Sequence, residues 1–306
     1  MNSVEVKNIV KTYGDVKAVD DVSFEVQKGE LFGLIGPDGA GKTSIFRILT
    51  TLLLADRGTA SVEGFDVVSQ YREIRNKVGY MPGRFSLYQD LTVQENLSFF
   101  STVFGTTIEE NYDLIKDIYE QIKPFNNRRA GKLSGGMKQK LALCCALIHK
   151  PEVLFLDEPT TGVDVVSRKE FWDMLGKLKK QGITIVVSTP YMDEATLCDR
   201  IALIQNGRIM SIDTPGNIVA NFPKMLFAVK ADNIYKLLRE LRANADVESC
   251  YAFGEYLHLT LKTGEATLTI AEQIANKQEP EGLAIKIVTP TIEDSFIRLM
   301  NEHNEK

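Results

Sequence analysis

The clearest hydrophobic pattern in the chain is a five-residue apolar run, Leu31–Ile35, that leads through a glycine-rich turn into an apolar-periodic segment from about Gly41 to Leu54. A short apolar run predicts a buried strand, and a period of 3.6 residues predicts a helix. Similar runs at Val153–Leu156 and Ile183–Ser188 predict further buried strands, and the alternation over Val4–Val10 predicts an edge strand. Strands that alternate with helices predict an α/β fold.

A purely helical stretch interrupts this alternation. Thr92 with Glu95, and Thr107 with Glu110, match the capping box that begins many helices. Apolar residues recur at helical spacing after each box. We therefore expect an inserted helical subdomain over about residues 88–140.

A second domain is expected after Thr214-Pro215-Gly216, where the pattern starts again. The segments beyond it follow the order β-α-β-β-α-β, which is the split βαβ arrangement. The expected domains are residues 1–215 and a small α+β domain over residues 216–306. We find no catalytic constellation in the second domain, and we interpret His258 as a packing or surface residue.

Composition narrows the class of protein. The 306 residues are 44% apolar and 25% charged, as in an ordinary globular protein. The net charge of −5 gives no basic field for nucleic acid. The four cysteines form no C-x-x-C pair, which favours buried reduced thiols. No apolar run is long enough to cross a bilayer, so a role at a membrane requires a partner.

The turn after Leu31–Ile35 fits G-x-x-x-x-G-K-[ST], with Gly36, Gly41, Lys42 and Thr43 at the fixed positions. Its glycines let successive N–H groups point into one concavity for phosphate oxygens, and the helix N-terminus adds partial positive charge. Lys42 should reach the β- and γ-phosphates, and Thr43 should bind Mg²⁺. The alternative is a chance match in an ordinary strand-to-helix turn.

Two carboxylates follow the apolar run at Val153. Asp157 and Glu158 come at the carboxyl end of the predicted strand, where open α/β sheets bind ligands. Asp157 would hold Mg²⁺, and Glu158 would polarise the attacking water. The alternative is that both are solvated carboxylates at a strand end. The phosphate loop earlier in the chain disfavours this alternative.

Two further features of the sequence are weaker indications of a nucleotide site. Ser134, Gly135 and Gly136 stand at a predicted helix start and would form a second anion-binding N-terminus, although Ser-Gly-Gly is also common in flexible turns. The aromatic Tyr13 precedes the phosphate-loop strand. From its position alone it either stacks on a base or is a half-buried tyrosine at a strand end.

Together these features resemble a known family. The first 215 residues resemble the nucleotide-binding subunit of ABC transporters in three segments with the family's order and spacing: LIGPDGAGKT, LSGGM and VLFLDEPTTGVD. The C-terminal PTIEDSFIRLM looks like the accessory domain of ABC-2-type exporter ATPases. The segments GPDGAGKT, SLYQDLTVQENL and LSGGMKQKLAL are particularly similar to bacterial multidrug-exporter ATPases of the YbhF kind.

The resemblance implies a P-loop NTPase fold of the ABC type and a head-to-tail dimer with ATP at the interface. On that basis Tyr13 stacks on adenine, Ser134–Gly136 contact the γ-phosphate held by the second subunit, and Asp164 lies in a loop that crosses the interface. The implied phosphate-binding residues are Gly36, Pro37, Asp38, Gly39, Ala40, Gly41, Lys42, Thr43 and Ser44.

Three positions depart from the family pattern. Gly83 stands where a glutamine normally contacts Mg²⁺ and water, Pro190 stands where a histidine normally contacts the γ-phosphate, and Asp38 replaces an asparagine. Losing one transition-state donor typically costs about 10²–10³ in rate. We therefore expect ATP binding and Glu158-dependent hydrolysis with slow turnover.

The leading hypothesis is an ATPase that powers export through separate ABC-2-type transmembrane subunits. It would act with a second ATP-binding subunit, identical or different, as a peripheral protein on the cytoplasmic face of the cell membrane. The alternative is an ATP-dependent dimerisation switch with little hydrolysis. An ABC protein of translation or DNA repair is disfavoured, because the chain has one cassette and no basic stretch.

Overall fold

A six-stranded sheet forms the centre of the N-terminal unit in this computed structural model, which describes residues 2–263, 266–277 and 280–304. Five neighbouring strands run parallel, and the sixth pairs antiparallel at one edge. In spatial order the strands are β10 (Arg208–Asp213), β9 (Arg200–Gln205), β3 (Leu31–Ile35), β8 (Thr184–Thr189), β7 (Val153–Asp157) and β6 (Val78–Met81).

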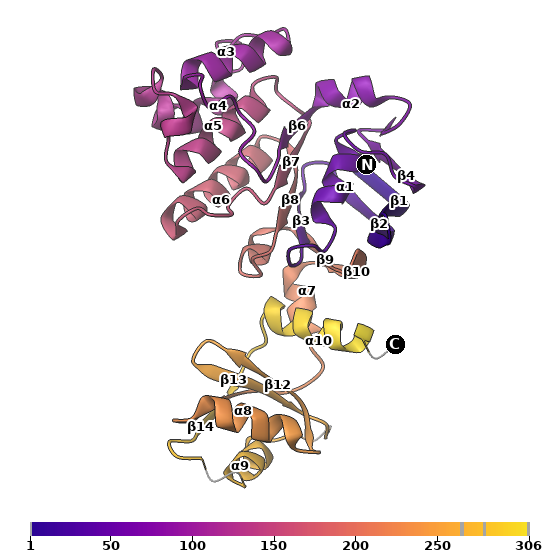
Figure 1. The fold of residues 1–306 in the computed structure, drawn as a ribbon, viewed down its shortest axis with the longest axis vertical. Helices are drawn as coiled ribbons and strands as arrows, with labels where there is room; N and C mark the ends of the chain where they lie inside the picture. Colours follow the sequence, from indigo (N-terminus) through magenta and orange to yellow (C-terminus); the bar gives the residue numbers. More distant parts are fainter. Residues whose placement is uncertain (1, 264–265, 278–279, 305–306) are drawn as a thin grey trace. The chain divides into compact units, whose positions relative to one another are not determined.

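The three apolar runs that predicted buried strands are confirmed as β3, β7 and β8, which are buried at every position. Both faces of a parallel sheet are covered, so its strands read as continuous apolar runs. Figure 1 shows α1 (Lys42–Leu49) on one side of these strands and α5 (Gly135–Leu147) and α6 (Val165–Lys180) on the other.

The helix after the phosphate loop is shorter than its predicted span from Gly41 to Leu54. It ends at Leu49, and Thr51 takes a left-handed φ of 63° that no helix accommodates. Leu52 and Leu54 are 58% and 63% exposed, so they do not extend the buried face of the helix. These exposed leucines happen to continue the apolar spacing of the helix, and the prediction therefore extended the helix too far.

A second, antiparallel sheet packs against α1. Its spatial order is β2 (Val16–Gln27), β1 (Asn2–Tyr13), β4 (Arg57–Val62) and β5 (Phe65–Asp66). The prediction that Val4–Val10 is an edge strand is therefore wrong, because β1 pairs with both β2 and β4. Its outward polar positions reflect one solvated face of an antiparallel sheet.

The helical insertion contains α3 (Val93–Val103), α4 (Tyr112–Ile122) and α5, with short 3₁₀ turns at Lys123–Phe125 and Ala130–Lys132. The capping box of Thr92 and Glu95 is confirmed at the start of α3. Thr107 and Glu110 also exchange the two capping hydrogen bonds, but α4 begins two residues later, at Tyr112. Helix α2 (Tyr71–Lys77) precedes β6.

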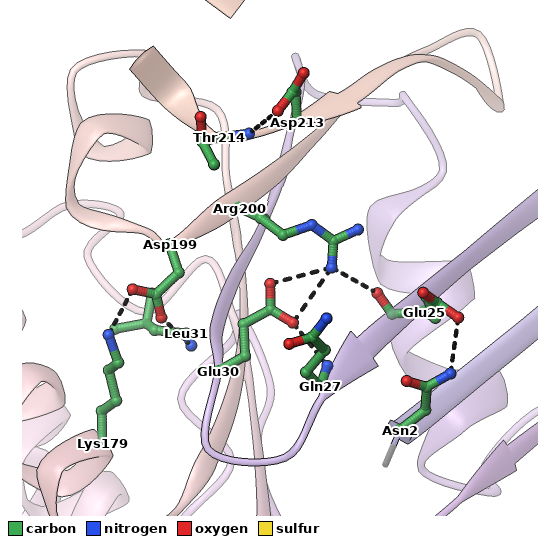
Figure 2. Close-up of polar contacts among 10 residues, drawn as sticks. All are labelled: Asn2, Glu25, Gln27, Glu30, Leu31, Lys179, Asp199, Arg200, Asp213 and Thr214. Atoms are coloured by element: carbon green, nitrogen blue, oxygen red, sulfur yellow. Dashed lines mark hydrogen bonds and ion pairs between the residues drawn. The ribbon is translucent and has the colours of Figure 1, made fainter. Parts of the chain in front are cut away.

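A polar cluster fixes the amino ends of β3 and β9 (Figure 2). The buried carboxylate of Glu30 accepts from Arg200 at 3.3 Å. Asp199 accepts from the Leu31 backbone N–H at 2.9 Å and from Lys179 of α6. These contacts lie at the opposite strand ends from the phosphate loop, so they serve to hold the sheet and α6 in register.

The chain divides between Pro215 and Gly216, and residues 216–298 form a second compact unit. Its antiparallel sheet has the order β12 (Val247–Phe253), β13 (Tyr256–Leu261), β11 (Leu226–Lys230) and β14 (Ala284–Val288). With α8 (Ile234–Ala243) and α9 (Leu268–Asn276) this is the predicted β-α-β-β-α-β order. The flanking helices are α7 (Pro215–Ala220) and α10 (Ile292–Asn304). Among the residues described, no helix combines the length and apolar character that crossing a membrane requires.

Candidate functional site

The glycine-rich turn between β3 and α1 has the backbone of an anion-binding loop. Gly39 and Gly41 take left-handed φ values of 80° and 100°, which L side chains rarely adopt. A Cβ at Gly41 would lie 2.2 Å from the Ala18 carbonyl oxygen, so glycine is required there on both counts. The turn thereby directs its N–H groups and the start of α1 toward one point.

Lys42 lies at the first turn of α1 and is only 3% exposed. Its ammonium donates to the carbonyl oxygens of Gly36 at 2.8 Å and Pro37 at 2.9 Å, and it is 3.1 Å from Glu158 Oε1. The structure thus brings the phosphate loop and the carboxylate after β7 into direct contact, although they are more than a hundred residues apart. A phosphate oxygen bound here would compete with Glu158 for the same ammonium.

Glu158 follows the last residue of β7 and takes an uncommon φ of 50°. Its backbone N–H reaches both the carbonyl oxygen of Ser188 at 3.1 Å and the Ser188 hydroxyl at 3.0 Å. These bonds hold the carboxyl end of β7 to β8. Holding a non-glycine residue in this region costs free energy, and such residues concentrate at functional sites.

Asp157 is 2% exposed and ends β7. One of its oxygens, Oδ1, accepts from Ser188 Oγ at 2.6 Å. Carboxylate and hydroxyl oxygens are the hard ligands that Mg²⁺ prefers, so the donors of Asp157 and Thr43 fit that ion. Sequence reasoning missed Ser188, because its pairing with Asp157 depends on a strand register that the sequence does not show.

Two of the three departures from the family pattern border this site. A Cβ at Gly83 would lie 3.1 Å from the Asp157 carbonyl oxygen, so a side chain at position 83 would begin beside the carboxylates. Pro190 directly follows Thr189, whose carbonyl oxygen accepts from the Gly36 N–H at 3.2 Å. The third, Asp38, is exposed in the turn.

Tyr80 of β6 is another neighbour that sequence reasoning did not single out. Burial and the nearby Asp157 carboxylate raise the pKa of its hydroxyl to about 12, against an opposing effect from Arg47. The tyrosine therefore stays neutral near the site at physiological pH.

Tyr13 lies at the end of β1, beside the phosphate loop. Its hydroxyl is 3.3 Å from Ser44 Oγ in α1, and the side chain is 46% exposed. The Lys11 ammonium lies 5.8 Å from the ring centre. The ring is thus adjacent to the phosphate-binding residues and remains open to a planar ligand.

Ser134, Gly135 and Gly136 lie at the start of α5, where Ser134 Oγ accepts from the Met137 N–H at 3.4 Å. A Cβ at Gly136 would lie 2.9 Å from Ser167 Oγ, and the Ser167 N–H donates to Asp164 at 3.0 Å. This loop and the Asp164 loop are therefore neighbours. Over the described part of the chain no hydrogen bond or ion pair joins Ser134–Gly136 to the phosphate loop of the same chain.

Comparison with known proteins identifies the family. A family model described as ABC transporter matches residues 19–161. The chain is 42% identical over 219 residues to the probable multidrug ABC transporter ATP-binding protein YbhF of Escherichia coli (strain K12), covering 71% of this chain and 38% of that protein. It therefore spans less than half the length of that relative. It is 33% identical over 311 residues to the Nod factor export ATP-binding protein I of Rhizobium etli, covering 100% of this chain and 96% of that protein.

A solved structure agrees with these sequence matches. The dimeric ATP-binding cassette MJ0796, in a post-hydrolysis state with ADP and Pi, matches with a TM-score of 0.63 and 26% identity over 69% of this chain and 98% of that one. The predicted P-loop NTPase fold is thereby confirmed. Because a relative matches over nearly its full length and the phosphate loop has the required backbone, the chain belongs to the ABC transporter family of P-loop ATPases.

Proposed function

We propose that this chain binds and hydrolyses ATP to power export through separate ABC-2-type transmembrane subunits. The observation that carries the proposal is the 3.1 Å contact between Lys42 and Glu158, because it assembles a phosphate-binding cation and a candidate general base at one point. The proposed direction, export, follows the name of the relative from Rhizobium etli, the Nod factor export ATP-binding protein I.

The residues of the site divide the work between them. Lys42 and the turn N–H groups would hold the β- and γ-phosphates, and Tyr13 would stack on the base. When bound, Mg²⁺ would neutralise phosphate charge, with Thr43 and Asp157 as its ligands. Once the Lys42 ammonium binds the phosphates and no longer pairs with Glu158, the Glu158 carboxylate would accept a proton from the attacking water.

A second ATP-binding subunit would complete the site. Ser134 and Gly135 are exposed, and they lie beside the Asp164 loop, where Val165 and Val166 are 79% and 69% exposed. Two exposed valines next to the N-terminus of α5 suit a surface that closes on another copy. Such a dimer would bring Ser134–Gly136 to the γ-phosphate of the partner, as expected from the dimeric relative MJ0796.

The proposed membrane partners would dock on an apolar groove beside position 83. This groove has a volume of about 510 Å³, and its lining comes from α2, β6, α3 and α5. Its apolar lining residues include Ile74, Met81, Leu87, Phe100, Val103 and Phe104. A transmembrane subunit could seat an apolar segment there, which would place this chain on the cytoplasmic face of the cell membrane as a peripheral protein.

ATP hydrolysis by the purified chain tests the proposal. We expect Glu158→Gln to lower kcat by about 10²–10⁴, the usual contribution of a positioned general base, with little change in ATP affinity. Glu170→Gln is the matched control, because Glu170 is an exposed carboxylate paired with Lys140 of α5. Equal activity of the wild type and Glu158→Gln would contradict the assignment.

A dimerisation switch with little hydrolysis is the second candidate. Gly83 and Pro190 favour it, because neither provides a side-chain donor at the positions that border Asp157 and Gly36. ATP-dependent dimerisation of the wild type without phosphate release would support this function over the first.

A further inference from the structure

Glu194 is a buried carboxylate that the roles assigned so far do not use. It begins the 3₁₀ turn Glu194–Leu197 after β8 and is 2% exposed. Its Oε1 accepts from Thr160 Oγ1 at 2.7 Å and from Arg168 Nε at 3.1 Å, and its Oε2 accepts from Thr189 Oγ1 at 2.5 Å. Three donors from three different segments therefore converge on one side chain.

Each of these segments borders the candidate site. Thr160 comes two residues after Glu158, and Arg168 lies in the first turns of α6, which Asp164 caps. Thr189 is the closest link to the phosphate loop, because its carbonyl oxygen accepts from the Gly36 N–H at 3.2 Å. A continuous path of hydrogen bonds thus runs from the phosphate loop through Thr189 and Glu194 to the loop that begins at Glu158.

The segment around Pro190 depends on the same carboxylate. The Tyr191 N–H donates to Thr189 Oγ1 at 3.1 Å, and the Arg168 guanidinium lies over the Tyr191 ring at 4.2 Å from its centre. Both partners of Tyr191 are themselves held by Glu194. The backbone at Pro190, which has no N–H of its own, is therefore fixed through its neighbours on either side.

Because Glu194 is buried, its hydrogen bonds are costly to break. A buried carboxylate is tolerated only when cations and donors compensate its charge, and removing one member of such a set leaves the others unsatisfied. The other carboxylate near Arg168 is Asp193, which is exposed and 3.4 Å away. Replacing the charge of Glu194 would therefore loosen the Thr160 loop, the Thr189 strand end and α6 together.

We propose that Glu194 is a positioning residue for ATP hydrolysis, which holds the Glu158 loop at a fixed place relative to the phosphate loop. This inference rests on the proposed ATPase function. A displacement of about 1 Å at a reacting group can cost about 10² in rate, so the effect is expected in kcat. Lys42 and the turn glycines would hold the nucleotide, and among the described residues no hydrogen bond or ion pair joins them to Glu194.

The first experiment compares steady-state ATP hydrolysis by the wild type, Glu194→Gln and Glu170→Gln. We expect Glu194→Gln to lower kcat by about 10- to 100-fold with a KM for ATP within about threefold of the wild type, because ground-state binding is kept. Glu170→Gln, which removes an exposed paired carboxylate on α6, should behave as the wild type. An unchanged kcat, or a loss confined to KM, would overturn the inference.

A second pair of variants separates positioning from folding. Thr160→Val removes one donor to Glu194 without changing the size of the side chain, and Thr160→Ser keeps the hydroxyl. We expect kcat to fall in Thr160→Val and to return in Thr160→Ser, and equal activity of the two would count against the proposal even where Glu194→Gln does not fold. A wild type without any hydrolysis would overturn the proposed function itself, whereas an active wild type with an active Glu194→Gln would overturn only this inference.

Discussion

Gly83 and Pro190 are single residues beside a site whose framework is otherwise intact. The phosphate loop, Lys42, Asp157 and Glu158 are in place, with Lys42 and Glu158 3.1 Å apart. Positions 83 and 190 border Asp157 and Gly36, yet they supply no side-chain donor. Missing donors of this kind lower transition-state stabilisation more than they lower ATP binding.

Restoring a donor should therefore accelerate turnover. We expect Pro190→His to raise kcat by about tenfold or more with ATP affinity within about threefold, because the imidazole would act mainly on the transition state. Phosphate release at saturating ATP and Mg²⁺ measures the change, and Glu170→Gln serves as a control for an exposed substitution outside the site. A kcat equal to that of the wild type would show that this position does not limit hydrolysis.

At the scale of elements, α10 is attached to the C-terminal sheet by one buried network. Asp294 is fully buried and accepts from His258 Nδ1 of β13 at 2.6 Å and from the Tyr251 hydroxyl of β12 at 2.6 Å. Its other oxygen accepts from the Thr291 N–H at 2.6 Å. His258, interpreted from sequence as a packing or surface residue, is thus buried and paired.

This network makes the stability of the C-terminal unit depend on pH. Burial alone would raise the pKa of Asp294. Hydrogen bonds from His258, Tyr251 and Thr291 outweigh this effect and lower the pKa to about 2. A depressed carboxyl pKa stabilises the fold above the unfolded value of about 3.9, and that contribution is lost as pH falls toward about 2. We expect Asp294→Asn to lower the free energy of unfolding by about 2 kcal/mol at pH 7 and by about half of that near pH 3.

Urea unfolding followed by circular dichroism at both pH values measures this difference. Glu293→Gln is the matched control, because Glu293 is the exposed neighbour of Asp294 on the same helix. A destabilisation of equal size at pH 7 and pH 3 would mean that the charge of Asp294 is not what holds α10 to β12 and β13.

Elements with a local signal were predictable from the sequence, and contacts between distant segments were not. The apolar runs of β3, β7 and β8 predict burial at each position, and the G-x-x-x-x-G-K-[ST] motif predicts that Lys42 stands at a helix start. The end of α1 and the central place of β1 depend on packing and on pairing with β4, which no local period encodes. Ser188 and Glu194 were missed for the same reason, since their partners lie up to 34 residues away in the sequence.

At the scale of the whole molecule, the proposed dimer would join two anion-binding elements that lie apart in one copy. The phosphate loop and Ser134–Gly136 belong to different parts of the N-terminal unit, with α1 and α5 on opposite sides of the sheet (Figure 1). Both present groups suited to anions, and among the described residues no hydrogen bond joins the two. A dimer in which each copy supplies one of them satisfies both at once.

The exposed valines give this dimer a direct test. We expect ATP and Mg²⁺ to dimerise Glu158→Gln, which retains bound nucleotide, and we expect Val165→Glu in that background to weaken dimerisation about tenfold or more, because an unpaired charge would be buried. Val68→Glu adds the same charge at another exposed valine and should leave the dimer intact. Sedimentation with and without ATP measures the change. Dimers of equal strength in both variants would place the interface away from the start of α6, and the Ser134 loop would then need another partner.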